Sequence, residues 1–386
     1  MSFEPNKIDW ANALLESIAK KIQLNKADYE KAVGRYHLIA EHLSEMYAGT
    51  FGKEPVIYPQ GSFRIRSTVA SYRDDDYDID LILEIATDPD SNPDDILDLV
   101  HDAMVEGQGK LKYGKVEKKR RCVRLRYEGM HIDITPGVLI NPANPRVISI
   151  FDSHPQRSDH AIANPEGFAQ WFDLAVLPQN ELAKRTVQAQ TFPVPDQEPL
   201  EQKPDRILSL QLLKRFRDIA CDAGDYDRCP SVLIAKLTAE APTVSRGGLI
   251  ADLKSCACYI RDELDVDDPY EENPRCEQDL FTDRWPEATQ AHKLLARDLN
   301  NLSNRLDALV EAGTLREKQD ILISLFGERA TKAAFTEVSD NFAKRSASES
   351  LSVSTTTGAI GVGMHTPAAA KSLPVKPHKF FGSEDI

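Results

Sequence analysis

The stretch YPQGSFRIRSTVASYRDDDYDIDLILEI, residues 58–85, contains the most specific pattern in the chain. Its last part alternates along a predicted strand, and one face is entirely apolar: Ile79, Leu81, Leu83 and Ile85. Asp78 and Asp80 lie on the other face, so both carboxylates emerge side by side from a strand that a core anchors. Like charges this close are unfavourable unless cations lie between them, and Mg²⁺ prefers such oxygen ligands. Taken alone, a D-x-D pair is more often two solvated acids on a half-exposed strand.

Two further features favour a site that binds metal and phosphate. Gly61 and Ser62 precede Asp78 at the end of a predicted strand. Glycine allows close backbone approach, serine offers a hydroxyl, and free N–H groups at a helix start bind phosphate. Asp133 lies between two isoleucines in a second predicted strand, so its side chain projects away from the core. A third carboxylate on a neighbouring strand would complete a two-metal site, whereas Asp133 by itself is an ordinary outward-facing acid.

The composition limits which classes of protein are possible. The 386 residues contain 47 Lys plus Arg and 61 Asp plus Glu, a formal net charge of −14. Coating nucleic acid requires many cationic contacts to phosphates, so this balance argues against that role, although not against a small basic site. No stretch reaches the ~18 apolar residues that a membrane span needs. The first residues do not read as a signal peptide, and the six cysteines include no C-x-x-C pair, so we expect a cytoplasmic protein with reduced thiols.

Periodicity predicts an α+β protein. The segments 8–24 and 27–47 have the spacing of amphipathic helices, and residues 50–140 read as a mixed unit of helices and strands. Within that unit, Val116–Tyr127 and Met130–Ile134 are predicted to be two strands joined by a hairpin turn at Glu128-Gly129. This organisation would hold the three aspartates on one sheet.

Helical patterns dominate the second half of the chain. Asn164-Pro165-Glu166 combines a capping side chain, a proline at the first helical position and an early acid, which predicts a helix start. Further segments are predicted to be helical: 206–223, 231–241, 248–264, 286–313 and 318–326. Residues 187–205 read as a long loop. Residues 346–386 are rich in small and polar residues without periodicity, which indicates a flexible tail.

The combined pattern resembles the polymerase-β-like nucleotidyltransferases. Gln60-Gly61-Ser62-Phe63 with Asp78-Ile79-Asp80-Leu81 is most similar to the bacterial CD-NTases. These enzymes are relatives of cyclic GMP–AMP synthase and oligoadenylate synthase that make cyclic oligonucleotide signals in antiphage (CBASS) defence. Four downstream segments are also similar to that family: residues 164–168, 212–216, 229–231 and 283–285.

The resemblance implies a two-lobed fold in which a mixed β-sheet palm faces a helical lobe. The corresponding division of the chain has four parts: N-terminal helices packing across both lobes (1–52), the palm with the catalytic carboxylates (53–160), the helical lobe (161–345) and the tail (346–386).

The resemblance also implies a role for each site residue. Asp78 and Asp80 would hold two Mg²⁺ ions, with Mn²⁺ as an alternative. Asp133 would hold the ion that activates the acceptor hydroxyl and act as the general base. The nucleotide-binding residues would contact the triphosphate of the donor: Gln60, Gly61, Ser62, Lys214 and Ser231.

Lys214 and the basic segment 112–126 can also be interpreted without the family resemblance. At ~100° per residue, Lys214 falls opposite an apolar stripe, so periodicity alone predicts an exposed side chain that faces a cleft or solvent. Residues 112–126 contain eight basic side chains, which could line a phosphate-rich cleft or bind RNA. We expect Lys118–Arg121 to be a solvated hairpin edge and Arg124 and Arg126, which share a strand face, to lie nearer the site. The acids 74–76 are expected to form a solvated loop.

The expected reaction is attack of a ribose hydroxyl on the α-phosphate of a second nucleotide, with release of pyrophosphate and closure to a cyclic di- or trinucleotide. NTPs, ATP among them, would be the substrates, and a regulatory or conjugating protein could act through the tail. Two alternatives remain open. One is a linear nucleotidyltransferase of the oligoadenylate or tRNA-end-adding kind, although the negative charge disfavours tRNA. The other is a partner-binding module with incidental activity.

Overall fold

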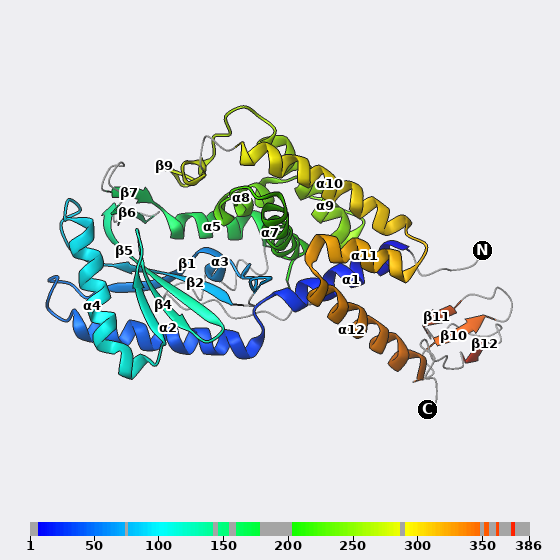
Figure 1. Ribbon diagram of the computed structural model, residues 1–386, viewed down its shortest axis with the longest axis horizontal. Helices are drawn as coiled ribbons and strands as arrows, with labels where there is room; N and C mark the ends of the chain where they lie inside the picture. Colours follow the sequence, from blue (N-terminus) through cyan, green and yellow to red (C-terminus); the bar gives the residue numbers. More distant parts are fainter. Residues whose placement is uncertain are drawn as a thin grey trace.

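The computed structural model describes residues 7–73, 76–141, 146–153, 160–177, 203–285, 290–347, 351–354, 360–362 and 372–374. It is an α+β protein in which two large hydrophobic cores are built from different elements. One core belongs to a seven-stranded sheet and the helices that cover it, here called the palm. The other belongs to the bundle of helices that forms the upper and right-hand parts of the view in Figure 1, here called the helical lobe.

The order of the palm strands brings distant segments together. Five strands follow one another across the sheet: β1 (Val56–Gln60), β2 (Tyr77–Glu84), β5 (Met130–Asn141), β4 (Val123–Tyr127) and β3 (Lys115–Lys118). β6 (Val147–Phe151) pairs with β5 and with β7 (His160–Ala163). Only the β2–β5 pair among these is parallel, and its register sets Asp80 opposite Asp133 and Asp78 opposite His131.

Two long helices cover one face of this sheet. α2 (Lys26–Met46) begins where the Asn25 side chain accepts a hydrogen bond from the backbone of Asp28, and its buried residues recur at helical spacing. α4 (Pro93–Leu111) begins in the same way with Asn92 as the cap and Pro93 in the first turn. Figure 1 shows both helices on the outer side of the sheet, away from the helical lobe. The opposite face is therefore left for the site.

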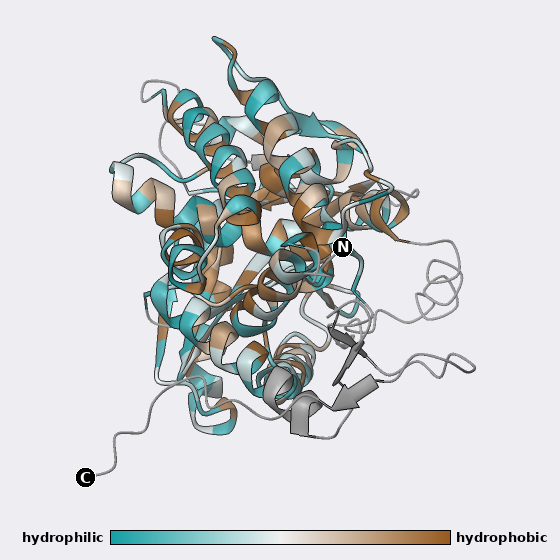
Figure 2. Cartoon of the chain, turned by 90° about the vertical axis from the view of Figure 1, so that its right-hand side faces the viewer, coloured by the Kyte–Doolittle hydropathy of each residue, from teal (hydrophilic) through white to brown (hydrophobic). Residues whose placement is uncertain are grey.

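The helical lobe surrounds α7 (Asp205–Gly224), which packs against several neighbours and is buried along most of its length. The described residues of this lobe also form the helices α1 (Lys7–Ile22), α5 (Pro165–Val176), α8 (Ser231–Glu240), α9 (Gly248–Leu264), α10 (Ala291–Glu311), α11 (Leu315–Phe326) and α12 (Glu328–Ala347). A short hairpin, β8 (Glu272–Asn273) with β9 (Cys276–Leu280), and the 3₁₀ helix η2 (Thr282–Arg284) complete it. In Figure 2 the apolar residues of these helices gather toward the interior.

The first two helices contribute to different cores. α1 packs in the helical lobe and α2 in the palm, and only residues 23–25 separate them. This junction is fixed from both sides: the Lys203 ammonium donates to the Gln23 side chain at 2.8 Å, and the Tyr77 hydroxyl donates to the Gln23 carbonyl at 3.2 Å. The N-terminal segment thus connects the two cores directly.

The structure corrects one expectation about the basic segment and adds contacts to another. Val116–Tyr127 is not one strand, because the chain turns between β3 and β4, where the Lys119 N–H donates to the Cys122 carbonyl. Lys118, Lys119 and Arg120 are exposed, as expected of a solvated hairpin edge, but the segment also forms ion pairs. Lys118 pairs with Asp98 of α4 at 2.6 Å, and Arg120 and Arg121 both hold the buried carboxylate of Asp152. These ion pairs fix the turn to the rest of the palm.

Other expectations fall partly outside the described residues. Most of the predicted loop 187–205 and residues 286–289 lie there, and the predicted helix 286–313 is described from Ala291 onward as α10. In the predicted tail, three short strands form an antiparallel sheet: β10 (Leu351–Ser354), β11 (Ile360–Val362) and β12 (Ser372–Pro374). None of the helices in the described ranges is both long and apolar enough to cross a membrane.

A buried ion pair provides a test of the helical lobe. Arg206 of α7 bonds the Asp252 carboxylate of α9 at 2.9 and 3.1 Å, and Ser209 donates to the same carboxylate. Asp252→Ala leaves the buried guanidinium without its counter-charge, so we expect a loss of ~3–5 kcal/mol in the free energy of unfolding, measured with urea. The exposed Lys254–Asp307 pair is the matched control, and Asp307→Ala should cost ~0–1 kcal/mol. Equal losses for the two variants would contradict this view of the core.

Candidate active site

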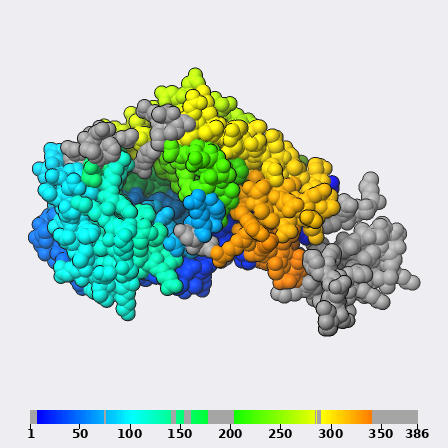
Figure 3. Space-filling model, in the orientation of Figure 1, coloured from blue at the N-terminus to red at the C-terminus, as the bar shows by residue number. Residues whose placement is uncertain are grey.

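A cleft of about 510 Å³ lies between the palm and the helical lobe. Figure 3 shows the surface hollowed between these two parts of the molecule. All residues expected to bind metal or nucleotide line this one cleft: Gln60, Gly61, Ser62, Asp78, Asp80, Asp133, Lys214 and Ser231. Of the two arginines expected near the site, Arg124 lines the cleft and Arg126 does not. Side chains separated by more than 150 positions in the sequence are therefore brought to one place.

The three aspartates come from the two parallel strands. Asp80 of β2 is directly opposite Asp133 of β5, and Asp78 lies two residues before Asp80 on the same face. Their surroundings differ, because the Asp78 side chain is 69% exposed and that of Asp133 is 15% exposed. Burial, followed by the charges of Asp133 and Asp78, raises the pKa of Asp80 to about 7. The site thus carries negative charge that the palm leaves incompletely compensated.

Gly61 brings the backbone against this carboxylate. It starts the short helix α3 (Gly61–Arg64) directly after β1, with a φ of +58°. A Cβ atom at this position would lie 2.8 Å from the Asp80 Oδ2 atom, which is closer than van der Waals contact permits. Both the backbone conformation and the approach to Asp80 therefore require glycine.

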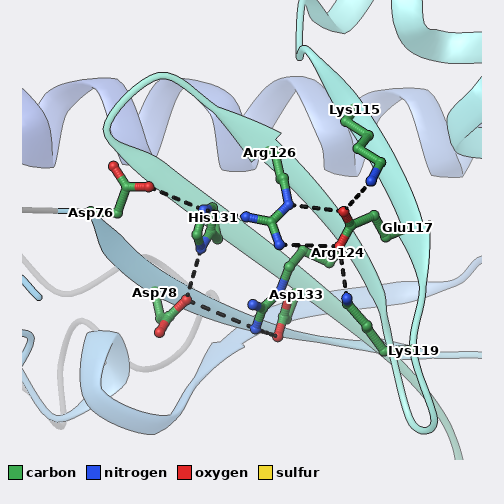
Figure 4. A network of polar contacts seen from close by, with 9 residues as sticks. All are labelled: Asp76, Asp78, Lys115, Glu117, Lys119, Arg124, Arg126, His131 and Asp133. Carbon is green, nitrogen blue, oxygen red and sulfur yellow. Dashed lines mark hydrogen bonds and ion pairs between the residues drawn. The ribbon is translucent and has the colours of Figure 1, made fainter. Parts of the chain in front are cut away.

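An arginine already occupies part of the carboxylate cluster. The Arg124 guanidinium donates from Nε and from a terminal nitrogen to the two oxygens of Asp133, both at 2.7 Å. The same side chain lies 3.9 Å from the Asp78 carboxylate (Figure 4). These bonds to Asp133 raise the pKa of Arg124 further, so the guanidinium stays charged.

The carboxylate oxygens of the three aspartates suit a hard divalent cation, but the three side chains do not converge on one point. Carboxylate oxygens from two strands are the ligands that Mg²⁺ takes, and a cation already bridges two of the three acids. Within the described ranges, no three His, Cys, Asp or Glu side chains converge as a ready metal site. The Asp133 carboxylate instead accepts hydrogen bonds from Arg124, so the cation beside it in Figure 4 is a guanidinium.

A second row of charges supports this cluster from β4 and β5. His131 lies between the carboxylates of Asp76, at 3.1 Å, and Asp78, at 3.4 Å. Arg126 contacts His131 at 3.1 Å and binds Glu117 (Figure 4). Asp76 is thus not a simple solvated loop acid as expected, whereas Asp74 and Asp75 lie outside the described residues.

The helical lobe supplies buried cations. Periodicity left open whether Lys214 faces solvent or a cleft and favoured solvent. The side chain lines the cleft and is only 3% exposed, because the face of α7 opposite its apolar stripe packs on the palm loop around Ser67. Its ammonium donates to the Ser67 hydroxyl at 2.7 Å and to the Ser67 carbonyl at 3.2 Å. Burial first, and then the nearby Arg217, lowers the pKa of Lys214 to about 7. A buried amine that faces a cleft is a strong candidate for anion binding.

Ser231 begins α8, as predicted, and is tied to the same group of cations. Its hydroxyl accepts a hydrogen bond from Arg217 at 2.9 Å, and Arg217 also donates to the Cys229 carbonyl. Sequence reasoning missed Arg217 and His131. Each had a detectable signal: Arg217 is one helical turn after Lys214, and His131 is two residues before Asp133 on the same strand face.

The raised pKa of Asp80 gives a pH dependence that can be measured. Between its ordinary value of 3.8 and about 7, the folded protein keeps a proton on Asp80 that the unfolded chain has released. The free energy of unfolding therefore falls as the pH rises through this range. Asp80→Asn cannot ionise, so without divalent ions we expect it to be more stable than the wild type above about pH 7 and similar to it below about pH 4.

Urea unfolding across this pH range, with a chelator present, measures the difference. Asp90→Asn is the control, because Asp90 is an exposed loop carboxylate. A stability difference between Asp80→Asn and wild type that does not change with pH would contradict the assignment.

Comparisons with known proteins agree with this geometry. The family model of the Cyclic GMP-AMP synthase DncV-like nucleotidyltransferase domain matches residues 55–136. The cyclic dinucleotide synthase CdnG of Bradyrhizobium diazoefficiens is 30% identical over 351 residues, covering 83% of this chain and 81% of the relative. The c-di-GMP synthase of Roseivirga ehrenbergii is 28% identical over 386 residues, covering 95% and 96%.

Solved structures show the same fold. CdnG of B. diazoefficiens in complex with GTP matches with a TM-score of 0.71 and 28% identity, over 86% of this chain and 100% of that chain. The Escherichia coli DncV structure bound to 3′-deoxy GTP has a TM-score of 0.54 at 16% identity, over 85% and 87%, and shows the fold alone. The expected α+β nucleotidyltransferase architecture is confirmed. The chain belongs to the CD-NTase family of metal-dependent nucleotidyltransferases, enzymes that join nucleotides into cyclic oligonucleotides.

Proposed function

We propose that this enzyme makes a cyclic dinucleotide and that GTP is at least one of its substrates. The observation that carries the proposal is the parallel register of Asp80 and Asp133 in a cleft that also contains the cations of α7. The names of the two curated relatives and the GTP complex of CdnG support the product class and the base. ATP, expected from the sequence, remains a candidate for the second nucleotide.

Each residue of the cleft has a role in this proposal. Gln60, Gly61 and Ser62, at the end of β1, bind the triphosphate of the donor nucleotide from the palm. Lys214 and Ser231 bind its β- and γ-phosphates from the helical lobe. Asp78, Asp80 and Asp133 would hold two Mg²⁺ ions, which when bound lower the pKa of the attacking hydroxyl and neutralise the leaving phosphates.

The bonds exchanged in each step follow from these positions. The ribose hydroxyl oxygen of the acceptor forms a bond to the α-phosphorus of the donor, and the bond from that phosphorus to the bridging oxygen breaks. Pyrophosphate leaves with the electron pair, and Asp133 accepts the hydroxyl proton. A second transfer, on the remaining triphosphate of the linear intermediate, closes the ring.

The biological setting is also a proposal. The CD-NTase family supports a role in antiphage signalling in the cytoplasm, and a regulatory or conjugating protein could act through the C-terminal segment. Most of that segment lies outside the described residues, so the chemistry of the cleft is the part that can be tested first.

The substrate and product can be tested directly. The purified protein is incubated with each NTP alone and with all four, with Mg²⁺ or Mn²⁺, and the products are identified by mass spectrometry after phosphatase treatment. We expect a phosphatase-resistant cyclic dinucleotide containing guanine. Asp78→Ala combined with Asp80→Ala should abolish it while circular dichroism stays unchanged. Linear products alone would favour the oligoadenylate-type alternative, and absence of any guanine-containing product would contradict the proposal.

Two glycines allow the role of Gly61 to be separated from backbone strain. Gly61 and Gly129 both have positive φ, +58° and +72°, so alanine strains the backbone at either position. Only at Gly61 does the new Cβ meet Asp80, whereas nothing lies within 4 Å at Gly129. We expect Gly61→Ala to slow product formation by roughly 10²-fold, because a small displacement of a catalytic group is costly. Gly129→Ala should retain near-wild-type turnover. Equal losses of turnover in the two variants would contradict the role of Gly61 in the site.

A further inference from the structure

Arg124 binds Asp133, the carboxylate that the proposed reaction needs as a metal ligand and general base. It pairs with Asp133 across the antiparallel β4–β5 ladder, and its fork uses both oxygens of that carboxylate. Paired donors of this kind bind a carboxylate more strongly than single contacts do. The pair is also partly shielded from water, since the two side chains are 26% and 15% exposed. Asp133 is therefore committed to an internal cation.

This cation cannot be removed by a change of protonation. A guanidinium stays charged at any working pH, so Arg124 can leave Asp133 only by moving. Its terminal nitrogen also lies 3.9 Å from Asp78, which places positive charge between two of the three acids (Figure 4). A divalent ion near Asp133 and Asp78 would meet both occupied oxygens and a like charge.

We propose that Arg124 is an internal counter-ion that keeps divalent metal from Asp133 until nucleotide phosphates enter the cleft and bind its guanidinium. Metal binding and nucleotide binding are then coupled through this one side chain, and each ligand increases the affinity of the other. The inference rests on the proposed function, because it assumes that the three aspartates form the metal site.

The surroundings of Arg124 indicate where its guanidinium can go. Glu117, its cross-strand neighbour on β3, already binds Lys115, Lys119 and Arg126 at 2.7 to 3.0 Å. That carboxylate offers no uncommitted charge for a fourth cation. Asp78 lies 3.9 Å away but belongs to the proposed metal site, and Arg124 itself lines the cleft, so the phosphates of a bound nucleotide can supply a new negative charge to its guanidinium.

The test measures metal binding rather than catalysis. Mn²⁺ is titrated into the full chain without nucleotide, and free Mn²⁺ is followed by electron paramagnetic resonance. We expect Arg124→Gln to bind Mn²⁺ roughly tenfold more tightly than wild type, within the ~5–150-fold range usual for coupled sites. Repeating the titration with a non-hydrolysable GTP analogue should raise the Mn²⁺ affinity of wild type more than that of Arg124→Gln.

Arg126→Gln is the matched control, because Arg126 is the neighbouring arginine on the same strand face but bonds Glu117 and His131 rather than Asp133. Arg124→Lys keeps the charge without the fork and should show a smaller gain, which keeps the test open if Arg124→Gln fails to fold. Unchanged or weaker Mn²⁺ binding in the Arg124 variants, or equal gains for Arg124→Gln and Arg126→Gln, overturns the inference.

The double variant Asp78→Ala with Asp80→Ala separates this failure from a failure of the proposed function. If it abolishes Mn²⁺ binding while Arg124→Gln leaves the affinity unchanged, the metal site stands and only the role of Arg124 is wrong. If Mn²⁺ binding does not depend on these two aspartates, the proposed metal site and the inference both fall.

Discussion

The parallel pairing of β2 with β5 is the constraint on which the rest of the site depends. Parallel neighbours need a long connection, and here the chain between them supplies α4 and the β3–β4 hairpin. The apolar faces of both strands are completely buried, so the alternate residues must point to the other side. Because the apolar residues of both strands are buried, the aspartates lie side by side even though their negative charges repel one another.

The charges that line the cleft are compensated differently in the palm and in the helical lobe. In the palm, Arg124 neutralises Asp133, while Asp80 retains a raised pKa because its charge is neither solvated nor fully paired. In the helical lobe, the buried Lys214 ammonium donates to the hydroxyl and the carbonyl of Ser67, whereas Arg217 is paired with the Asp218 carboxylate at 2.7 Å. Asp80 in the palm and Lys214 in the helical lobe are thus incompletely compensated groups of opposite sign. Such local conflicts are characteristic of functional sites, because a bound ligand resolves them.

Strand periodicity was sufficient to predict that Asp78, Asp80 and Asp133 project from the non-core face of two strands, and the wider pattern predicted the Gly61-Ser62 turn and the α+β class. The metal-binding role proposed for the aspartates came from the family resemblance. For Lys214 the helical wheel left solvent and a cleft open and favoured solvent, whereas the side chain is buried and lines the cleft, because α7 is enclosed on several sides. The contacts of His131 and Asp76 were also beyond reach. They depend on the register between β2 and β5, strands that are far apart in the chain, and no local pattern fixes that register.

The buried cations of the cleft have a consequence for how a nucleotide arrives. The whole chain carries −14, so an approaching triphosphate is repelled at long range. Attraction begins only within about one Debye length of the cleft, ~8 Å at physiological ionic strength. Salt screens the distant repulsion more than the enclosed contacts. Nucleotide binding by this enzyme should therefore be unchanged, or even stronger, at ionic strengths at which proteins that bind nucleic acid through exposed charges release it.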